Sequence, residues 1–171
     1  MTGSSHVLLE TTVDGTEALG ELGARLARVL RAGDLVVLTG PLGAGKTTLT
    51  RGLGAALGAR GQVSSPTFVL ARTHPTTAGP DLVHVDAYRL SDPVELDDLD
   101  LDWDAAIVVV EWGRGMVDGV SDSLLDVEIT RATGADAGPA APDDTDPDDV
   151  PDEPRRVVVT ASGPRWQGVV L

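Results

Sequence analysis

The chain has 171 residues, contains no cysteine and carries a formal net charge of −14 at pH 7. The lack of cysteine excludes disulfides, thiolate metal sites and thiol catalysis, and the negative charge opposes direct binding of a nucleic acid backbone. We therefore expect one domain that reaches any nucleic acid only indirectly, through other proteins.

The sequence shows no sign of export or membrane insertion. Its first six residues have neither the positive nor the apolar stretch of a signal peptide. No apolar run approaches the roughly 20 residues that span a bilayer. The sequence therefore predicts a soluble, cytoplasmic protein with no membrane contact.

Residues 6–12 predict a first strand, and the residues after it predict a helix that runs to about residue 30. Asp14 and Glu17 have capping-box spacing at the start of this helix. Its apolar residues recur every three or four positions, which places them on one buried face. These residues are Leu19, Leu22, Leu26, Val29 and Leu30.

A strand, a glycine-rich loop and a second helix follow in direct succession. Residues 35–38 are a continuous apolar run, as in a strand buried on both faces of a parallel sheet. The helix is predicted over residues 47–57 and is closed by Gly58. A phosphate-binding loop requires this order of elements.

Short strand-like segments outnumber helices in the rest of the chain. A short acidic helix is predicted at residues 93–99, and strands are predicted at residues 67–72, 82–86, 107–111, 124–130 and 155–161. We therefore expect an α/β fold with a P-loop NTPase-like mixed sheet. The sheet would be parallel at its centre, with antiparallel strands late in the chain, and flanked by helices.

An acidic insertion is predicted at about residues 132–154, within a single domain that covers residues 1–171. Its eight acidic residues face no base and supply −8 of the net charge of −14. The segment is rich in Pro, Ala, Gly and Thr and has almost no large apolar side chains. It cannot offset its own ordering entropy, which predicts disorder.

The glycine-rich loop satisfies the pattern G-x-x-x-x-G-K-[ST] from Gly40 to Thr47. Its backbone N–H groups would surround phosphate oxygens, and the N-terminus of the following helix would add positive charge. Lys46 would reach the β- and γ-phosphates of ATP, and the Thr47 hydroxyl would bind Mg²⁺. The expected nucleotide-binding residues of this segment are Pro41, Leu42, Gly43, Ala44, Gly45, Lys46, Thr47 and Thr48.

Lys46 is the only lysine among thirteen Lys and Arg residues. A chain that uses arginine at every other basic position keeps a compact ammonium where one must fit among phosphates. With no second lysine, the chain has no N-K-x-D element for guanine recognition. ATP is therefore the expected nucleotide, and a GTPase is a poor interpretation.

Two apolar runs end in a carboxylate, at Asp86 and at Glu111. Ligands of open α/β sheets gather at the carboxyl ends of strands, where a magnesium-binding or water-orienting acid must lie. Which of the two acids would be the main magnesium ligand stays open. His84, on one of these runs, is interpreted as a core histidine, and Trp112 as a partly buried anchor.

The segment with Ser65 and Thr67 allows two interpretations. It would present a hydroxyl to the γ-phosphate as a nucleotide sensor, or it would be a plain turn before a strand, because Ser-Pro is a common turn former. The residues alone do not decide between them.

Four motifs in this order resemble those of the TsaE family, formerly called YjeE. They are the loop from residue 40 to 48, Ser65-Pro66-Thr67, the run His84-Val85-Asp86-Ala87-Tyr88-Arg89-Leu90, and Val110-Glu111-Trp112. The resemblance covers about residues 14–131. Two features depart from the family pattern: Gly113-Arg114-Gly115 after the tryptophan, and the acidic insertion.

The resemblance implies an ATPase that acts with TsaB and TsaD in forming threonylcarbamoyladenosine beside the tRNA anticodon. Such a protein would hydrolyse ATP weakly alone, be stimulated by its partners, and support turnover of the complex without transferring the group. Lys46, Asp86 and Glu111 would be catalytic, and Thr47 and Glu111 would hold magnesium. Thr67 would sense the nucleotide, and Thr16 would lie near the base.

Two other functions fit the same loop. A small P-loop kinase would need a lid, which usually shows as an arginine cluster, whereas the arginines here are scattered and residues 92–104 are acidic. A nucleotide-gated binding module would close around ATP without meaningful hydrolysis. The two acids at strand ends argue against that module.

Overall fold

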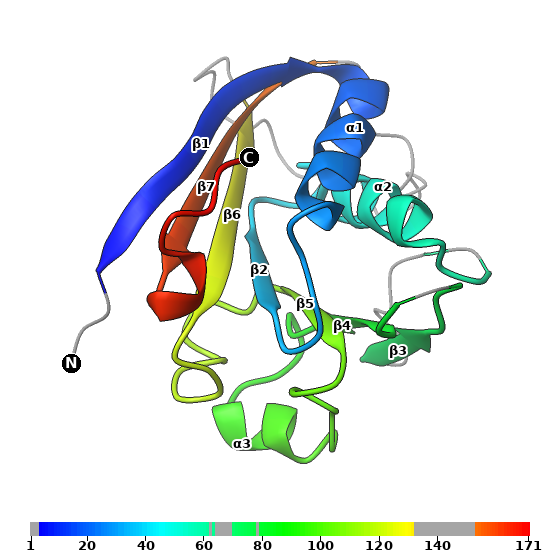
Figure 1. Cartoon of the computed structure of the whole chain (residues 1–171), viewed down its shortest axis with the longest axis vertical. Helices are drawn as coiled ribbons and strands as arrows, with labels where there is room; N and C mark the ends of the chain where they lie inside the picture. The colour runs from blue at the N-terminus through cyan, green and yellow to red at the C-terminus, as the bar shows by residue number, and fades with distance from the viewer. Residues whose placement is uncertain (1–3, 62, 64–69, 78, 132–152) are drawn as a thin grey trace.

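The computed structural model describes residues 4–61, 63, 70–77, 79–131 and 153–171, which form one mixed sheet with helices on both faces (Figure 1). The strands are β1 (Ser5–Asp14), β2 (Leu35–Thr39), β3 (Ala71–His74), β4 (Leu82–Asp86), β5 (Ile107–Glu111), β6 (Leu124–Arg131) and β7 (Pro154–Ser162). The helices are α1 (Gly15–Ala27), α2 (Lys46–Leu57), α3 (Pro93–Asp97) and a single 3₁₀ turn, η1 (Pro164–Trp166). In this part of the chain, no helix is long and apolar enough to cross a membrane.

The strand order is β1-β7-β6-β2-β5-β4-β3. The four central strands β6, β2, β5 and β4 are parallel, which confirms the expected parallel centre. Antiparallel pairs lie at both edges, β3 on β4 and β7 between β6 and β1. β7 is the antiparallel strand late in the chain that the sequence predicts, and β3 is a second antiparallel strand, earlier in the chain.

The central strands are apolar throughout because both faces of the sheet are covered. All residues of β4 and β5 are buried, as are the first four of β2. One face packs against α1, α2 and Trp166, and the other packs against α3 and the loops around it, including Leu96 and Val117. Alternation of polar and apolar residues is therefore absent from these strands.

Several boundaries differ from the sequence expectation. α1 ends at Ala27 rather than near residue 30, and Asp14 occupies its N-cap position without a side-chain capping bond. α3 ends at Asp97. Residues 64–69 and 132–152, which carry the sensor segment and most of the predicted insertion, lie outside the described residues, and β7 begins already at Pro154.

α1 and α2 lie side by side (Figure 1) and approach closely through glycines. A Cβ on Gly52 of α2 would overlap the backbone carbonyl oxygen of Gly20 in α1, and one on Gly23 would overlap the carbonyl oxygen of Leu49. A Cβ on Gly20 itself would meet no neighbouring atom within 4 Å. The close approach thus depends on Gly23 and Gly52.

Gly52→Ala is expected to reduce the free energy of unfolding by about 3 kcal/mol or more, because the new methyl group meets backbone atoms that cannot rotate away. Gly20→Ala is the matched control in the partner helix, and it should be neutral or stabilising by up to about 1 kcal/mol. Urea denaturation followed by circular dichroism measures both. Equal stability of the two variants would contradict the packing described.

Candidate functional site

The glycine-rich loop joins the end of β2 to the start of α2, and its path depends on glycine. Gly43 and Gly45 have φ values of +74° and +108°, in the left-handed region that side chains disfavour. A Cβ on Gly45 would overlap Leu19 of α1, and one on Gly40 would lie 2.5 Å from the carbonyl oxygen of Ile129 in β6. The loop is therefore confined between α1 and β6.

Lys46, the first residue of α2, lies against its own loop and is 6% exposed. Its Nζ donates hydrogen bonds to the carbonyl oxygens of Gly40 at 2.8 Å and Pro41 at 3.0 Å. Burial lowers the pKa of Lys46 below its ordinary 10.5, while the charges of Glu111 and Asp86 oppose that shift. The ammonium is thus within electrostatic reach of both acids.

Glu111 lies beside the loop because β5 is parallel to β2, with Glu111 opposite Leu38. The Thr47 hydroxyl donates a hydrogen bond of 3.0 Å to Oε1 of Glu111, whose side chain is buried. A hydroxyl and a carboxylate oxygen in contact are the type of donor set that suits Mg²⁺. Since the described residues hold no cluster of three or more His, Asp and Glu suited to a metal ion, a cation here would also need phosphate oxygens.

His84 lies behind Glu111 and is fully buried on β4. Its Nε2 is 3.7 Å from Oε2 of Glu111, and neither imidazole nitrogen hydrogen-bonds to a residue that the structure describes. The sequence placed His84 in the core. It is indeed buried, but it also packs directly against the acid of the site.

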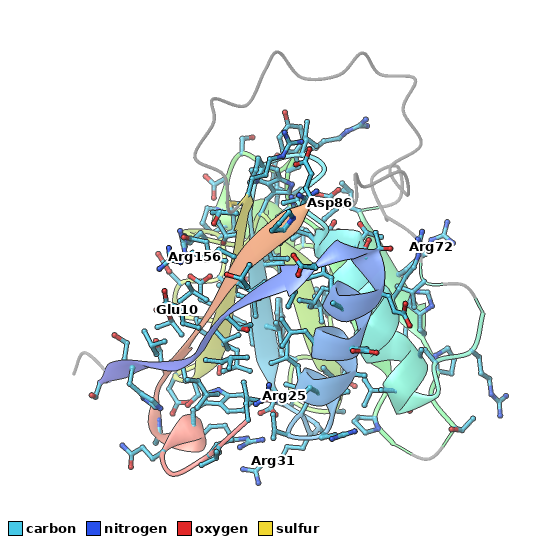
Figure 2. The ribbon with its side chains drawn as sticks, turned by 90° about the horizontal axis from the view of Figure 1, so that it is seen from above. Glu10, Arg25, Arg31, Arg72, Asp86 and Arg156 are labelled. Atoms are coloured by element: carbon cyan, nitrogen blue, oxygen red, sulfur yellow. The ribbon has the colours of Figure 1, made fainter. Side chains whose placement is uncertain are left out.

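Asp86 is the last residue of β4 and lies directly opposite Glu111, the last residue of β5. Because these strands are parallel, both acids lie at the same end of the strands. Its carboxyl is buried, and Oδ1 accepts the N–H of Tyr88 at 3.0 Å. Figure 2 shows Asp86 at one end of the sheet. The structure thus brings Lys46, Thr47, Asp86 and Glu111 together at the carboxyl ends of the parallel strands, as the motifs predicted.

Trp112 closes the site from the side of β5. Its φ is +60°, an unusual value for a bulky residue, and its N–H donates to the carbonyl oxygen of Leu38 at 3.0 Å. The ring lies 4.3 Å from Nζ of Lys46 and 5.2 Å from the ring of Tyr88. The sequence suggested only an anchoring role, yet the indole face contacts the site's ammonium in a cation–π geometry.

Arg155, at the start of β7, is a site residue that the sequence reasoning missed. Its buried guanidinium donates from Nε to the carbonyl oxygen of Ala44 at 3.1 Å and from Nη2 to that of Gly43 at 3.3 Å. More than 100 residues separate Arg155 from the loop, and it belongs to no local motif. Only the pairing of β7 with β6 and β1 brings it there.

The remaining expected residues lie less centrally. Thr16 is exposed in the first turn of α1, three residues before Leu19, which contacts the loop. Leu42 is 65% exposed, and Thr48 is half-buried on α2. Thr67 falls outside the described residues, so its sensor role stays a prediction.

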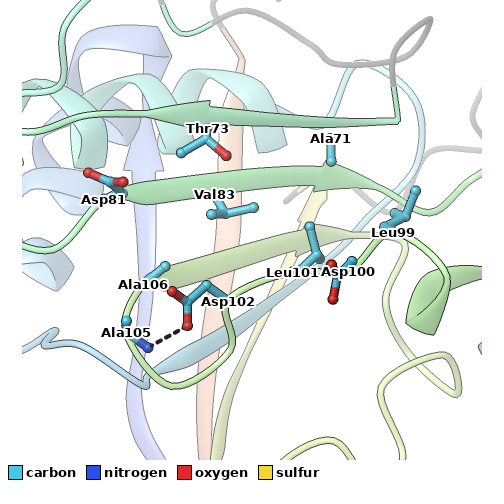
Figure 3. A pocket seen from close by; sticks show the side chains of 10 residues that line it. All are labelled: Ala71, Thr73, Asp81, Val83, Leu99, Asp100, Leu101, Asp102, Ala105 and Ala106. Carbon is cyan, nitrogen blue, oxygen red and sulfur yellow. Dashed lines mark hydrogen bonds between the residues drawn. The ribbon is translucent and has the colours of Figure 1, made fainter.

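A hollow of about 380 Å³ lies away from the loop, beside β3 and β4 (Figure 3). It is lined by apolar side chains and by Asp81, Asp100 and Asp102, and Asp102 accepts the N–H of Ala105 at 3.2 Å. Carboxylates repel phosphate groups, so this hollow does not suit a nucleotide. The buried charged side chains of Lys46, Asp86, Glu111 and Arg155 lie at the loop instead.

Comparison with known proteins places these features in a family. A family model described as "Threonylcarbamoyl adenosine biosynthesis protein TsaE" matches residues 13–137. A Streptomyces coelicolor protein named tRNA threonylcarbamoyladenosine biosynthesis protein TsaE is 55% identical over 150 residues, covering 85% of this chain and 92% of the relative. A Bacillus subtilis protein of the same name is 32% identical over 155 residues, covering 89% of this chain and 83% of the relative.

The fold also has a solved counterpart. The crystal structure of Bacillus subtilis YdiB superposes with a TM-score of 0.70, covering 98% of this chain and 92% of that one, at 24% sequence identity. This likeness confirms the P-loop type of mixed α/β fold that the sequence predicts.

The pKa of Lys46 is expected to lie below 10.5, because burial disfavours its charged form more than the two acids favour it. Glu111→Gln should lower this pKa further, since it removes the larger opposing charge, whereas Glu10→Gln on the exposed face of β1 should leave it unchanged. Reductive ¹³C-methylation labels Lys46 as the sole side-chain amine, and its NMR titration gives the pKa directly. A value at or above 10.5 would contradict the burial described.

Proposed function

The chain belongs to the TsaE family of threonylcarbamoyl adenosine biosynthesis proteins, and from this membership we propose that it is a magnesium-dependent ATPase acting in that tRNA modification. In this proposal it works with TsaB and TsaD and supports turnover of their complex without transferring the threonylcarbamoyl group. Its net charge of −14 fits a protein that reaches tRNA only through these partners.

The hydrogen bond between Thr47 and Glu111 is the observation that carries the proposal. It joins the last residue of the phosphate-loop motif to an acid at the end of β5. In P-loop proteins, a hydroxyl and a carboxylate in these places hold the Mg²⁺ that accompanies the nucleotide. Thr47 and Glu111 would hold Mg²⁺, which would neutralise phosphate charge when bound. Because Thr47 contacts Glu111, we favour Glu111 over Asp86 as the carboxylate ligand.

The remaining side chains have separate roles in this proposal. The N–H groups of the loop and the ammonium of Lys46 would bind the phosphates and hold the γ-phosphate in place. Asp86, which lies opposite Glu111 at the end of the neighbouring strand, would orient the attacking water. Trp112 would keep Lys46 from bulk water on the indole side. This constellation needs no second substrate pocket.

The distribution of charge supports an ATPase over a small-molecule kinase. A kinase must bind a second substrate near the γ-phosphate, commonly one that is itself anionic. The hollow beside β3 and β4 is lined by three aspartates, and Arg114 is engaged on the surface with Asp126 and Glu128. Neither feature would attract a phosphorylated substrate.

MgATP is expected to protect Lys46 from an amine-reactive reagent, because its Nζ would lie against the β- and γ-phosphates. Peptide mass spectrometry reads the modification at this one lysine, and the α-amino group of Met1 serves as the internal control for reagent activity. Equal labelling of Lys46 with and without saturating MgATP would overturn the nucleotide assignment.

ATP turnover is expected to be slow for the protein alone and at least ten-fold faster with TsaB and TsaD. Glu111→Gln and Asp86→Asn should each reduce the stimulated rate on the order of 10²-fold, because each removes a charge needed for hydrolysis. Glu10→Gln on β1 is the matched carboxyl-to-amide control and should keep the wild-type rate. Phosphate release measures all four proteins.

Phosphate release and tRNA modification together separate the partner-dependent ATPase from a nucleotide-gated binding module. No change in turnover on adding TsaB and TsaD would contradict the partner-dependent ATPase. If Asp86→Asn lost hydrolysis yet still supported tRNA modification in a reconstituted system with all partners, the output would be nucleotide-gated assembly rather than hydrolysis.

A further inference from the structure

Arg155 places a buried positive charge directly behind the phosphate-binding loop. Its side chain is 1% exposed, and β7 fixes its position by pairing Arg155 with Val13 of β1 and Arg131 of β6. A buried guanidinium is costly unless its N–H groups are hydrogen-bonded. Here two of the three guanidinium nitrogens donate to carbonyl oxygens of the loop itself, at Ala44 and Gly43.

The third nitrogen links this contact to the start of β7. Nη1 donates to the backbone carbonyl oxygen of Glu153 at 3.4 Å and to its Oε2 at 3.3 Å. The carboxylate of Glu153 also lies 3.8 Å from Nε of Arg131. The guanidinium is therefore held on one side by the strand ends and on the other by the loop.

Fixing two carbonyl groups also fixes the amide groups that follow them. In a trans peptide the C=O and N–H bonds point in opposite directions, and the described residues contain no cis peptide. The hydrogen bond from Arg155 to the carbonyl oxygen of Gly43 thus orients the whole peptide group between Gly43 and Ala44. The N–H of Ala44 points the opposite way and donates to the carbonyl oxygen of Pro41 at 3.1 Å. The bond to Ala44 likewise sets the direction of the Gly45 N–H, away from Arg155.

We propose that Arg155 is a positioning residue of the phosphate site. Its guanidinium holds the carbonyl group of Gly43, which keeps the turn from Pro41 to Ala44 closed, and the carbonyl group of Ala44, so that the amide of Gly45 faces the phosphates. The assignment rests on the proposed function, because it concerns the same ATP site. Arg155 does not touch the nucleotide in this proposal. It acts through the loop, and it adds a fixed charge behind the anion.

Arginine suits this position better than lysine does. The planar fork of a guanidinium spans two adjacent carbonyl oxygens at once, while an ammonium is a single point of charge on a flexible stem. Arg155→Lys should therefore keep the charge but lose one of the two loop contacts. Arg155→Met keeps most of the apolar stem and loses both.

The test measures the affinity for MgATP and for inorganic triphosphate by isothermal titration calorimetry. Arg155→Met should weaken both at least five-fold, and the amide hydrogen of Ala44, which is bonded to the carbonyl oxygen of Pro41, should exchange with solvent at least five-fold faster by NMR. Binding of inorganic triphosphate reports the phosphate site without the base. If Arg155→Met does not fold, Arg155→Lys should still weaken both ligands at least five-fold.

Two arginines serve as controls. Arg156 is the adjacent residue on β7, half-exposed and paired with Glu10 on the surface (Figure 2), so Arg156→Met should bind like the wild type. Arg165 donates to both carboxyl oxygens of Asp34, at 2.9 Å each. Arg165→Met thus removes a largely buried guanidinium and its ion pair away from the loop, and should leave affinity and loop exchange unchanged.

The binding measurements distinguish failure of the role of Arg155 from failure of the proposed function. Less than a five-fold change in a folded Arg155 variant overturns the assignment and leaves the proposed function intact, provided that the wild type binds MgATP. An equal loss in Arg165→Met would show general destabilisation and also overturns it. Failure of the wild type itself to bind MgATP or triphosphate would overturn the proposed function together with the role of Arg155.

Discussion

The site depends on the parallel pairing of β4, β5 and β2 in that order. This register sets Asp86 opposite Glu111 and Glu111 opposite Leu38, two residues before the loop begins. A shift of one residue would turn each acid to the other face of the sheet. Because both faces are packed with apolar side chains, such a shift would place the two carboxylates among apolar side chains, which is costly. The packing that stabilises the sheet therefore also positions the acids.

Buried positive charges flank the loop although the molecule as a whole is strongly negative. The net charge is −14, yet the loop is flanked by the buried cations Lys46 and Arg155, with Glu111 and Asp86 on the strands beside it. In a buried environment such charges act at short range, while exposed acids elsewhere are screened by salt. A protein whose net charge opposes binding to a nucleic acid backbone would therefore still be able to hold the phosphates of the proposed nucleotide.

The elements of the fold could be predicted where the pattern was local. The apolar runs of β2, β4 and β5, the loop motif and α2 all follow from neighbouring residues, and the structure confirms them. The end of α1 at Ala27 could not be predicted, because Val29 and Leu30 continue its apolar spacing. The absence of a side-chain hydrogen bond from Asp14 at the N-cap could not be predicted either, because Asp14 and Glu17 have capping-box spacing. The same limit applies to the site: Lys46, Thr47, Asp86 and Glu111 belong to motifs, whereas Arg155 comes to the loop only through strand pairing.

The pairing of β6 with β7 fixes Arg155 against the glycine-rich loop. The strands are joined in register up to Arg131 and Arg155, and the ion pair of Arg131 with Glu153 lies next to this last pair. Arg155 belongs to this last pair, so the strand pairing itself holds its guanidinium at the carbonyl oxygens of Ala44 and Gly43.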